Sequence, residues 1–74
     1  MTTEEVQRLI EAGIPGATAK VTDMTGTGDH FAAEVAAPAF NGKTMVEQHQ
    51  MVYAAVREEM KGPIHALKLT TRVA

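Results

Sequence analysis

The amino-acid sequence predicts a small α+β protein in which a three-stranded mixed sheet packs on helices. Apolar and polar residues alternate with a period of two in three segments, and two other segments have the three-to-four-residue spacing of amphipathic helices. Glycine and proline separate these segments, which follow the order helix, strand, strand, helix, strand. The 74 residues suffice for a single domain over 1–74, whose folding must rest on apolar residues because the chain has no cysteine.

The first helix is predicted near the N-terminus. Thr2 and Glu5 have the spacing of a capping box, in which each side chain accepts a hydrogen bond from the backbone N–H of the other residue. The sequence GIPG ends the helix after about Ala12. Its apolar face is expected to comprise Val6, Leu9 and Ile10.

The second helix is predicted to be the longer one. Thr44 and Glu47 form another capping box, and the sequence KGP ends the helix. Glu47, Gln48 and Gln50 are expected on its exposed face. A histidine in an apolar row is typically a core side chain that donates to a neighbouring carbonyl, so His49 is interpreted as a packing residue. The whole apolar row is Val46, His49, Val52, Tyr53, Val56 and Met60.

The alternating segments predict three strands over residues 17–22, 31–36 and 64–71. The first two form a hairpin whose loop, Thr25 to Asp29, contains the glycines and short polar residues that tight turns require. The second strand reaches the third through a helix, and such crossovers make two strands parallel and usually neighbouring.

His30 and His65 lie at the starts of these two parallel strands. Parallel strands start at the same sheet edge, so the two imidazoles are expected within a few strand spacings of about 4.8 Å. Because His65 begins a strand whereas His30 ends a glycine-bearing loop, we expect the ring of His65 to be the better oriented.

Imidazole is a common ligand of borderline metals, and Asp29 is a third candidate ligand beside the histidine pair. A closed zinc site requires four protein ligands, and an iron-sulfur cluster usually requires thiolates, so a partner would have to complete the site. The alternatives are a solvated turn histidine for His30, a backbone-bonded strand-end residue for His65, and a turn-stabilising role for Asp29.

Composition argues against several classes of protein. The net charge is −2 and the seven basic residues are scattered, which leaves no electrostatic footprint for nucleic acid. No nucleophile, base and orienting acid share a recognisable spacing, so we expect neither an enzyme nor a small-molecule substrate. No apolar run approaches the roughly 20 residues of a membrane span, and the acidic N-terminal segment does not resemble a signal sequence, so a soluble cytoplasmic protein is expected. The methionines after Met1 are interpreted as packing residues.

Three segments, VTDMTGTGDHF, FNGKTMVEQHQMVY and IHALKLTT, resemble the signature segments of the BolA family in their usual order and separation. The resemblance covers nearly the whole chain. It implies an αββααβ fold similar to the class II KH domain, and it adds a short helix near Pro38 to Phe40.

The resemblance also implies a partner and a cofactor. BolA-like proteins are associated with monothiol glutaredoxins, with which they form heterodimers that bridge a 2Fe–2S cluster, and with iron-sulfur trafficking and iron regulation. In this family picture the glutaredoxin and its glutathione each supply a sulfur ligand. The BolA-like chain supplies the histidine of the HAL segment, here His65, and a Cys or His of the first loop, here His30.

Two other functions stay open from the sequence. The first is a KH-like transcriptional regulator that binds nucleic acid, for which FNGK offers a single glycine and Lys43 where KH domains use a GxxG loop with basic neighbours. DNA binding through so few phosphate contacts would be weak. The second is an adapter that binds a partner protein without metal.

Overall fold

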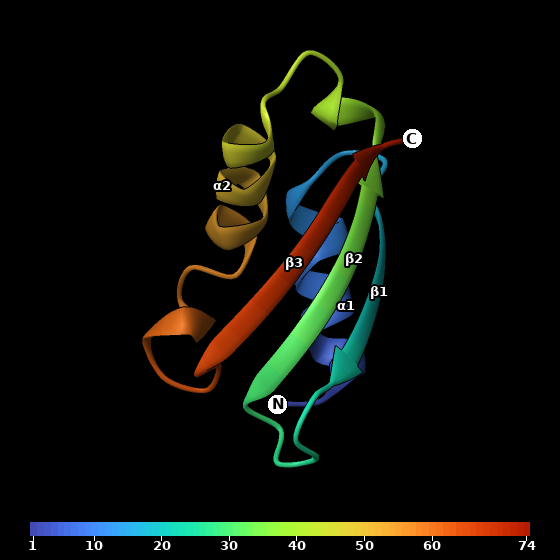
Figure 1. The fold of residues 1–74 in the computed structure, drawn as a ribbon. Coiled ribbons are helices and arrows are strands. Elements are labelled where there is room, and N and C mark those ends of the chain that lie inside the picture. The colour runs from blue at the N-terminus through green and yellow to red at the C-terminus, as the bar shows by residue number, and fades with distance from the viewer.

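A computed structural model describes residues 1–74, and its three strands form one sheet with helices on one side (Figure 1). The predicted α+β class is therefore confirmed. The predicted short helix after the second strand is present as a 3₁₀ turn. In chain order the elements are α1 (Thr3–Gly13), β1 (Thr18–Asp23), β2 (His30–Ala37), η1 (Pro38–Phe40), α2 (Met45–Ala55), η2 (Glu59–Lys61) and β3 (Ala66–Val73).

The sheet has the order β1-β2-β3 and is mixed, as predicted. β1 pairs antiparallel with β2, and β3 pairs parallel with β2 in a register that sets His30 opposite Ala66. α1 lies behind the sheet in the view of Figure 1, and α2 lies beside β3. The viewer therefore looks onto a sheet face that no helix covers.

The alternation of side chains along the strands builds the core. Phe31, Ala33 and Val35 of β2 are buried beneath the helices, whereas Glu34 between them is exposed. Burial of large apolar side chains is the main term that stabilises a chain of this size. The other fully buried large side chains are Val6, Ile10, Ile14, Phe40, Val52, Val56 and Ile64.

Both predicted capping boxes are present. Thr2 Oγ1 accepts from the Glu5 backbone N–H at 3.2 Å, and Glu5 Oε1 accepts from the Thr2 N–H at 2.8 Å. Thr44 and Glu47 repeat the arrangement at 3.1 and 2.8 Å. In each box the hydrogen bonds from the threonine lower the pKa of the glutamate below its ordinary value. These caps explain why both helices start where the sequence predicts.

The predicted length of the second helix is wrong, because α2 ends at Ala55. Val56 leaves helical geometry with φ of −118° and ψ of 23°, and its N–H donates to Tyr53 O at 3.2 Å in a tightened last turn. Val56 is completely buried, and the separate turn η2 carries the chain toward β3. The apolar periodicity continues through Met60, but packing against the core takes precedence over it.

The predicted core face of α2 is also displaced. Val46 is 66% exposed, whereas Gln48, expected outside, is buried. Gln48 is satisfied there, since its Nε2 donates to Lys43 O at 3.1 Å and its Oε1 accepts from Thr71 Oγ1 at 2.7 Å. A buried polar residue with such partners carries little desolvation cost, so it can occupy a core position that apolar periodicity assigns elsewhere. Among the methionines interpreted as packing residues, Met24 and Met45 are likewise exposed.

The third strand begins later than predicted. β3 starts at Ala66 because Ile64 is buried in the core and its N–H donates to Glu59 O of η2 at 2.9 Å. His65 therefore lies just before the strand. Neither α-helix has the length and apolar character needed to cross a bilayer.

Candidate functional site

The two histidines meet at one end of the sheet. Their ring centroids are 5.7 Å apart and the ring planes are inclined by 38°. His65 is exposed, and 38% of the His30 side chain is accessible. The expectation that the parallel crossover brings the two rings together is therefore confirmed, and both rings can be reached by another molecule.

Asp29 links both histidines through different atoms. Its backbone carbonyl accepts from the backbone N–H of His65 at 2.7 Å and, at 3.3 Å, from that of Ala66. Its carboxylate Oδ1 lies 2.7 Å from Nδ1 of His30. One residue thus ties the end of the hairpin loop to the start of β3 and orients the ring of His30.

The electrostatics of Asp29 determine which ring nitrogen of His30 is free. The Thr27 hydroxyl, which donates to the carboxylate, and then the His30 ring hold the pKa of Asp29 below its ordinary value of 3.8. The ionised carboxylate can only accept hydrogen bonds, so Nδ1 of His30 must be the donor. In the neutral ring this leaves the lone pair on Nε2, which is the usual metal-binding arrangement of a histidine paired with a carboxylate.

The backbone N–H groups of the turn are bound by the side chain of Asp23 and not by that of Asp29. The Asp23 carboxylate accepts from the backbone N–H groups of Thr25, Gly26 and Gly28 at 3.2, 2.9 and 2.9 Å. Gly26 and Gly28 have φ of +74° and +75°, a backbone conformation that other residues rarely adopt. Because Asp23 stabilises the turn, the side chain of Asp29 is available to hold the histidine.

The expectation that His65 has the better oriented ring is wrong. His30 is the first residue of β2, its carbonyl accepts from Met24 N–H at 2.8 Å, and Asp29 holds its ring. His65 is pinned only through its backbone. The ring with the fixed direction is therefore that of His30.

The residues fit half of a metal or cluster site. Two imidazoles that share a tetrahedral metal at about 2.0 Å place their centroids about 5 Å apart, close to the observed separation. Asp29 does not complete the set, because no three His, Cys, Asp or Glu side chains are arranged to hold a metal ion. The chain can thus offer two nitrogen ligands and needs further donors from elsewhere.

The remaining predicted residues lie apart from this pair. Lys43 is exposed between η1 and α2, at the opposite end of β2, where its charge contributes to lowering the pKa of Glu47 (Figure 1). His49 is half-buried, and its Nε2 is buried without a hydrogen-bond partner. The predicted bond from His49 to a carbonyl is therefore not found for this atom.

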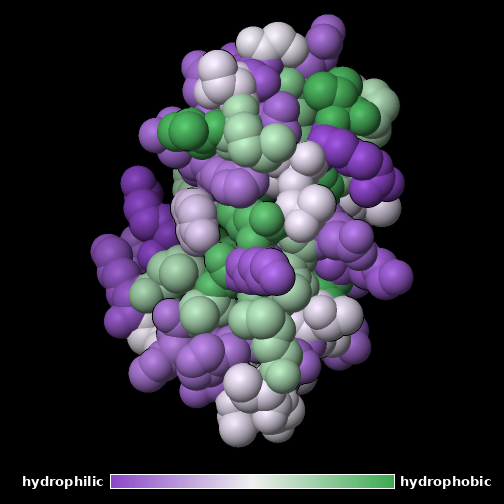
Figure 2. Space-filling view, in the orientation of Figure 1, coloured by the Kyte–Doolittle hydropathy of each residue, from purple (hydrophilic) through white to green (hydrophobic).

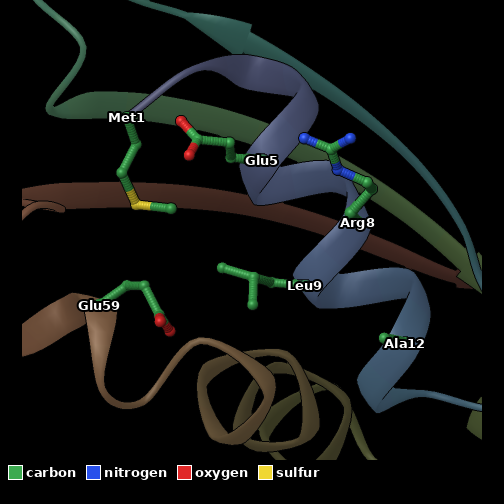
Figure 3. A pocket seen from close by; sticks show the side chains of 6 residues that line it. All are labelled: Met1, Glu5, Arg8, Leu9, Ala12 and Glu59. Carbon is green, nitrogen blue, oxygen red and sulfur yellow. The ribbon is translucent and has the colours of Figure 1, made fainter.

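The largest hollow, about 460 Å³, lies between α1 and η2 (Figure 3). It brings together none of the predicted site residues. Its walls combine apolar side chains with two carboxylates and one guanidinium: Met1, Glu5, Arg8, Leu9, Ala12 and Glu59.

Sequence reasoning missed two polar contacts near the site. The orienting role of Asp29 was obscured by the common habit of turn aspartates to bond their own backbone, although an acid directly before a histidine is a usable signal. Tyr53 was interpreted as an apolar helix residue, yet its hydroxyl donates to Leu67 O at 2.9 Å and attaches α2 to β3. No local pattern indicates that second contact.

The fold and the histidine pair define a small α+β protein with a three-stranded mixed sheet and two solvent-accessible imidazoles at one sheet end. The family model described as BolA-like protein matches residues 13–74. The chain is 39% identical over 70 residues to Protein BOLA2 of Arabidopsis thaliana, and the matched region covers 93% of this chain and 74% of that protein. The chain therefore belongs to the BolA family.

Other relatives agree with this assignment. The uncharacterized protein RP812 of Rickettsia prowazekii is 31% identical over 68 residues, covering 92% of this chain and 88% of the relative. The structure of a bolA protein homologue from Coxiella burnetii superposes with a TM-score of 0.83 at 36% identity, covering 96% of this chain and 88% of that one. The fold prediction and the family resemblance are both confirmed.

Proposed function

We propose that this protein is an adapter for iron-sulfur cluster trafficking and iron regulation in the cytoplasm. In this proposal it binds a monothiol glutaredoxin, and His30 and His65 co-ligate a 2Fe–2S cluster that bridges the two proteins. The single observation that carries the proposal is the exposed histidine pair with ring centroids 5.7 Å apart. Family membership supplies the context.

The ligand chemistry supports this reading of the pair. Two histidines on one iron of a 2Fe–2S cluster are known from Rieske centres, so nitrogen ligation of such a cluster is chemically sound. The chain has no cysteine, so the sulfur ligands would come from the glutaredoxin and its glutathione. When bound, the cluster would supply redox-active iron. The role of this chain is to present two nitrogens, one of them directed by Asp29.

The experiment is co-expression with a monothiol glutaredoxin, purification without added metal, and measurement of the visible spectrum and the stoichiometry. A coloured 1:1 heterodimer supports the proposal. A colourless 1:1 complex would favour the metal-free adapter. No complex, together with sequence-selective DNA binding at physiological salt, would favour the transcriptional regulator and would direct attention to Lys43.

Substitutions then test the two ligands separately. His30→Ala and His65→Ala should each remove or strongly alter the cluster absorption of the heterodimer, whereas protein association without cluster can persist. His30→Cys should restore a tightly bound cluster with a changed spectrum, because thiolate is the usual cluster ligand. His49→Ala is the matched control, since His49 lies on α2 away from the pair, and it should leave the spectrum unchanged. An unchanged spectrum in both alanine variants of the pair would refute the ligand assignment.

A further inference from the structure

The uncovered face of the sheet is a separate feature that the histidine pair does not explain. Strand register places eleven outward side chains on this face, because residues two apart on a strand share a face. His30 and Ala66 lie at the end that holds the histidine pair, and the other nine form three rows beyond them. The opposite side chains, such as those of Ala19, Val35 and Thr71, are buried beneath the helices. Row by row across β1, β2 and β3, the outward residues are Thr18, Ala36 and Arg72, then Lys20, Glu34 and Thr70, then Thr22, Ala32 and Lys68.

This face concentrates positive charge on an acidic protein. It carries three of the seven cations and one of the nine carboxylates, a net charge of +2. The other four cations and eight carboxylates give the rest of the chain −4. The two salt bridges of the structure, His30–Asp29 and Lys61–Glu58, lie elsewhere, so no ion pair within 4 Å neutralises these cations.

The shape of the face fits an extended ligand. Along the middle strand two alanines flank Glu34, and the threonines and the three basic residues lie on β1 and β3 on either side. Two adjoining hollows of about 270 and 360 Å³ share Lys20 and Glu34. Lys68 and Arg72 lie four residues apart on β3, which corresponds to about 13 Å between their Cα atoms. In the space-filling view, hydrophilic side chains flank this face and one crosses its centre (Figure 2).

We propose that this face docks an acidic, extended segment of a partner protein. Carboxylates four residues apart on such a segment would match the spacing of Lys68 and Arg72, and a third would reach Lys20 across the sheet. Glu34 lies in the centre of the face, so its carboxylate disfavours a uniformly acidic ligand. It selects for a segment that places a hydrogen-bond donor between its carboxylates.

The other polyanions fit this surface less well. Single-stranded nucleic acid is usually held by aromatic side chains that stack on bases. No phenylalanine, tyrosine or tryptophan lies on this face, since Phe31 and Phe40 are buried and Tyr53 lies on α2. An anionic membrane favours apolar side chains that enter the lipid, and the face offers nothing larger and apolar than Ala32 and Ala36.

The test is fluorescence anisotropy of the full chain at low and physiological salt with a labelled extended peptide that carries a glutamate at every fourth position and serine and glutamine between the glutamates. A triple variant, Lys20→Gln, Lys68→Gln and Arg72→Gln, should weaken binding about tenfold, since each exposed ion pair contributes a factor of about two to three. The control triple, Arg8→Gln, Lys43→Gln and Arg57→Gln, has the same net charge and should change binding less than twofold.

Two further measurements locate the binding. Glu34→Gln should tighten peptide binding about two- to threefold, an effect that a purely structural residue would not produce. Amide chemical shifts should move in β1, β2 and β3, with small changes in α1.

Several results would overturn the proposal. Equal weakening by both triple variants would mean that total charge controls the binding. An oligothymidylate or phosphatidylserine vesicle that binds through this face, when the peptide does not, would assign it to nucleic acid or to membrane. Since none of these probes contains a metal or a glutaredoxin, the result is independent of the proposed cluster function.

Discussion

Replacing Asp29 by alanine is the most informative single change at the histidine pair. The substitution removes the carboxylate that lies 2.7 Å from Nδ1 of His30. It leaves the backbone carbonyl that accepts from His65 N–H at 2.7 Å. The variant therefore releases one ring and keeps the backbone that positions the other, so its effect reports on the orientation of His30 alone.

The expected magnitude comes from the known behaviour of groups that orient metal-binding histidines. Loss of such a hydrogen bond typically lowers metal affinity by about 10- to 100-fold. We expect Asp29→Ala to speed the loss of the heterodimer's cluster absorption to a chelator by about that factor, since affinity changes within one complex act mainly on dissociation. In the free chain, ¹⁵N spectra of His30 should change from the Nδ1–H tautomer to a mixture of both tautomers.

Two matched variants separate orientation from folding. Asp29→Asn retains an oxygen acceptor without the charge, so its cluster lifetime should lie between those of wild type and Asp29→Ala. Asp23→Ala should loosen the turn, because Asp23 accepts three backbone N–H groups, while the Asp29 contact to the ring remains. If Asp29→Ala has the wild-type cluster lifetime and the wild-type tautomer, the orienting role is refuted.

The same contact predicts a direction of pH dependence. The pKa of Asp29 in the folded protein lies below its ordinary value of 3.8, chiefly because of the Thr27 hydroxyl and then the His30 ring. A lowered pKa means that the carboxylate stabilises the fold above 3.8 and that this contribution is lost as pH falls through the lower folded value. Thermal unfolding of wild type and Asp29→Ala should therefore differ most near neutral pH and converge in strong acid.

Three stability predictions follow from packing and hydrogen bonding, each measurable by urea unfolding. Gly13→Ala should destabilise the protein by about 1 kcal/mol, because a Cβ there would lie 2.6 Å from that of Ala55, and overpacking outweighs the gain of about 1 kcal/mol in helix propensity. In a chain that already carries Ala55→Gly, the clash is removed and Gly13→Ala should instead stabilise the protein. Tyr53→Phe should cost about 0.5 to 1 kcal/mol through loss of the hydroxyl bond to Leu67 O, and a neutral result would show that water replaces that bond. His49→Leu should stabilise by about 1 kcal/mol by removing a buried unpaired nitrogen, whereas a loss of more than 1 kcal/mol would show that the nitrogen is satisfied.

Local patterns in the sequence determined most of the fold and the place of the histidine pair. Capping at Thr2 and Thr44 is decided within four residues, and period-two alternation is decided within a strand, so both can be recognised without the rest of the molecule. The proximity of His30 and His65 follows from a crossover rule that depends only on element order. The signature segments likewise identified the family, because they are local strings.

The tertiary structure alone decided which local preferences prevailed where elements meet. α2 ends at Ala55 because Val56 packs in the core, and Gln48 is buried because Thr71, 23 residues away, satisfies it. The contact of Asp29 with His30 could be recognised only from the structure, where Asp23 already stabilises the turn. These outcomes depend on partners that are distant in the chain, and local periodicity does not reveal where those partners lie. Side-chain hydrogen bonds then select among arrangements whose free energies differ by only about 1 kcal/mol.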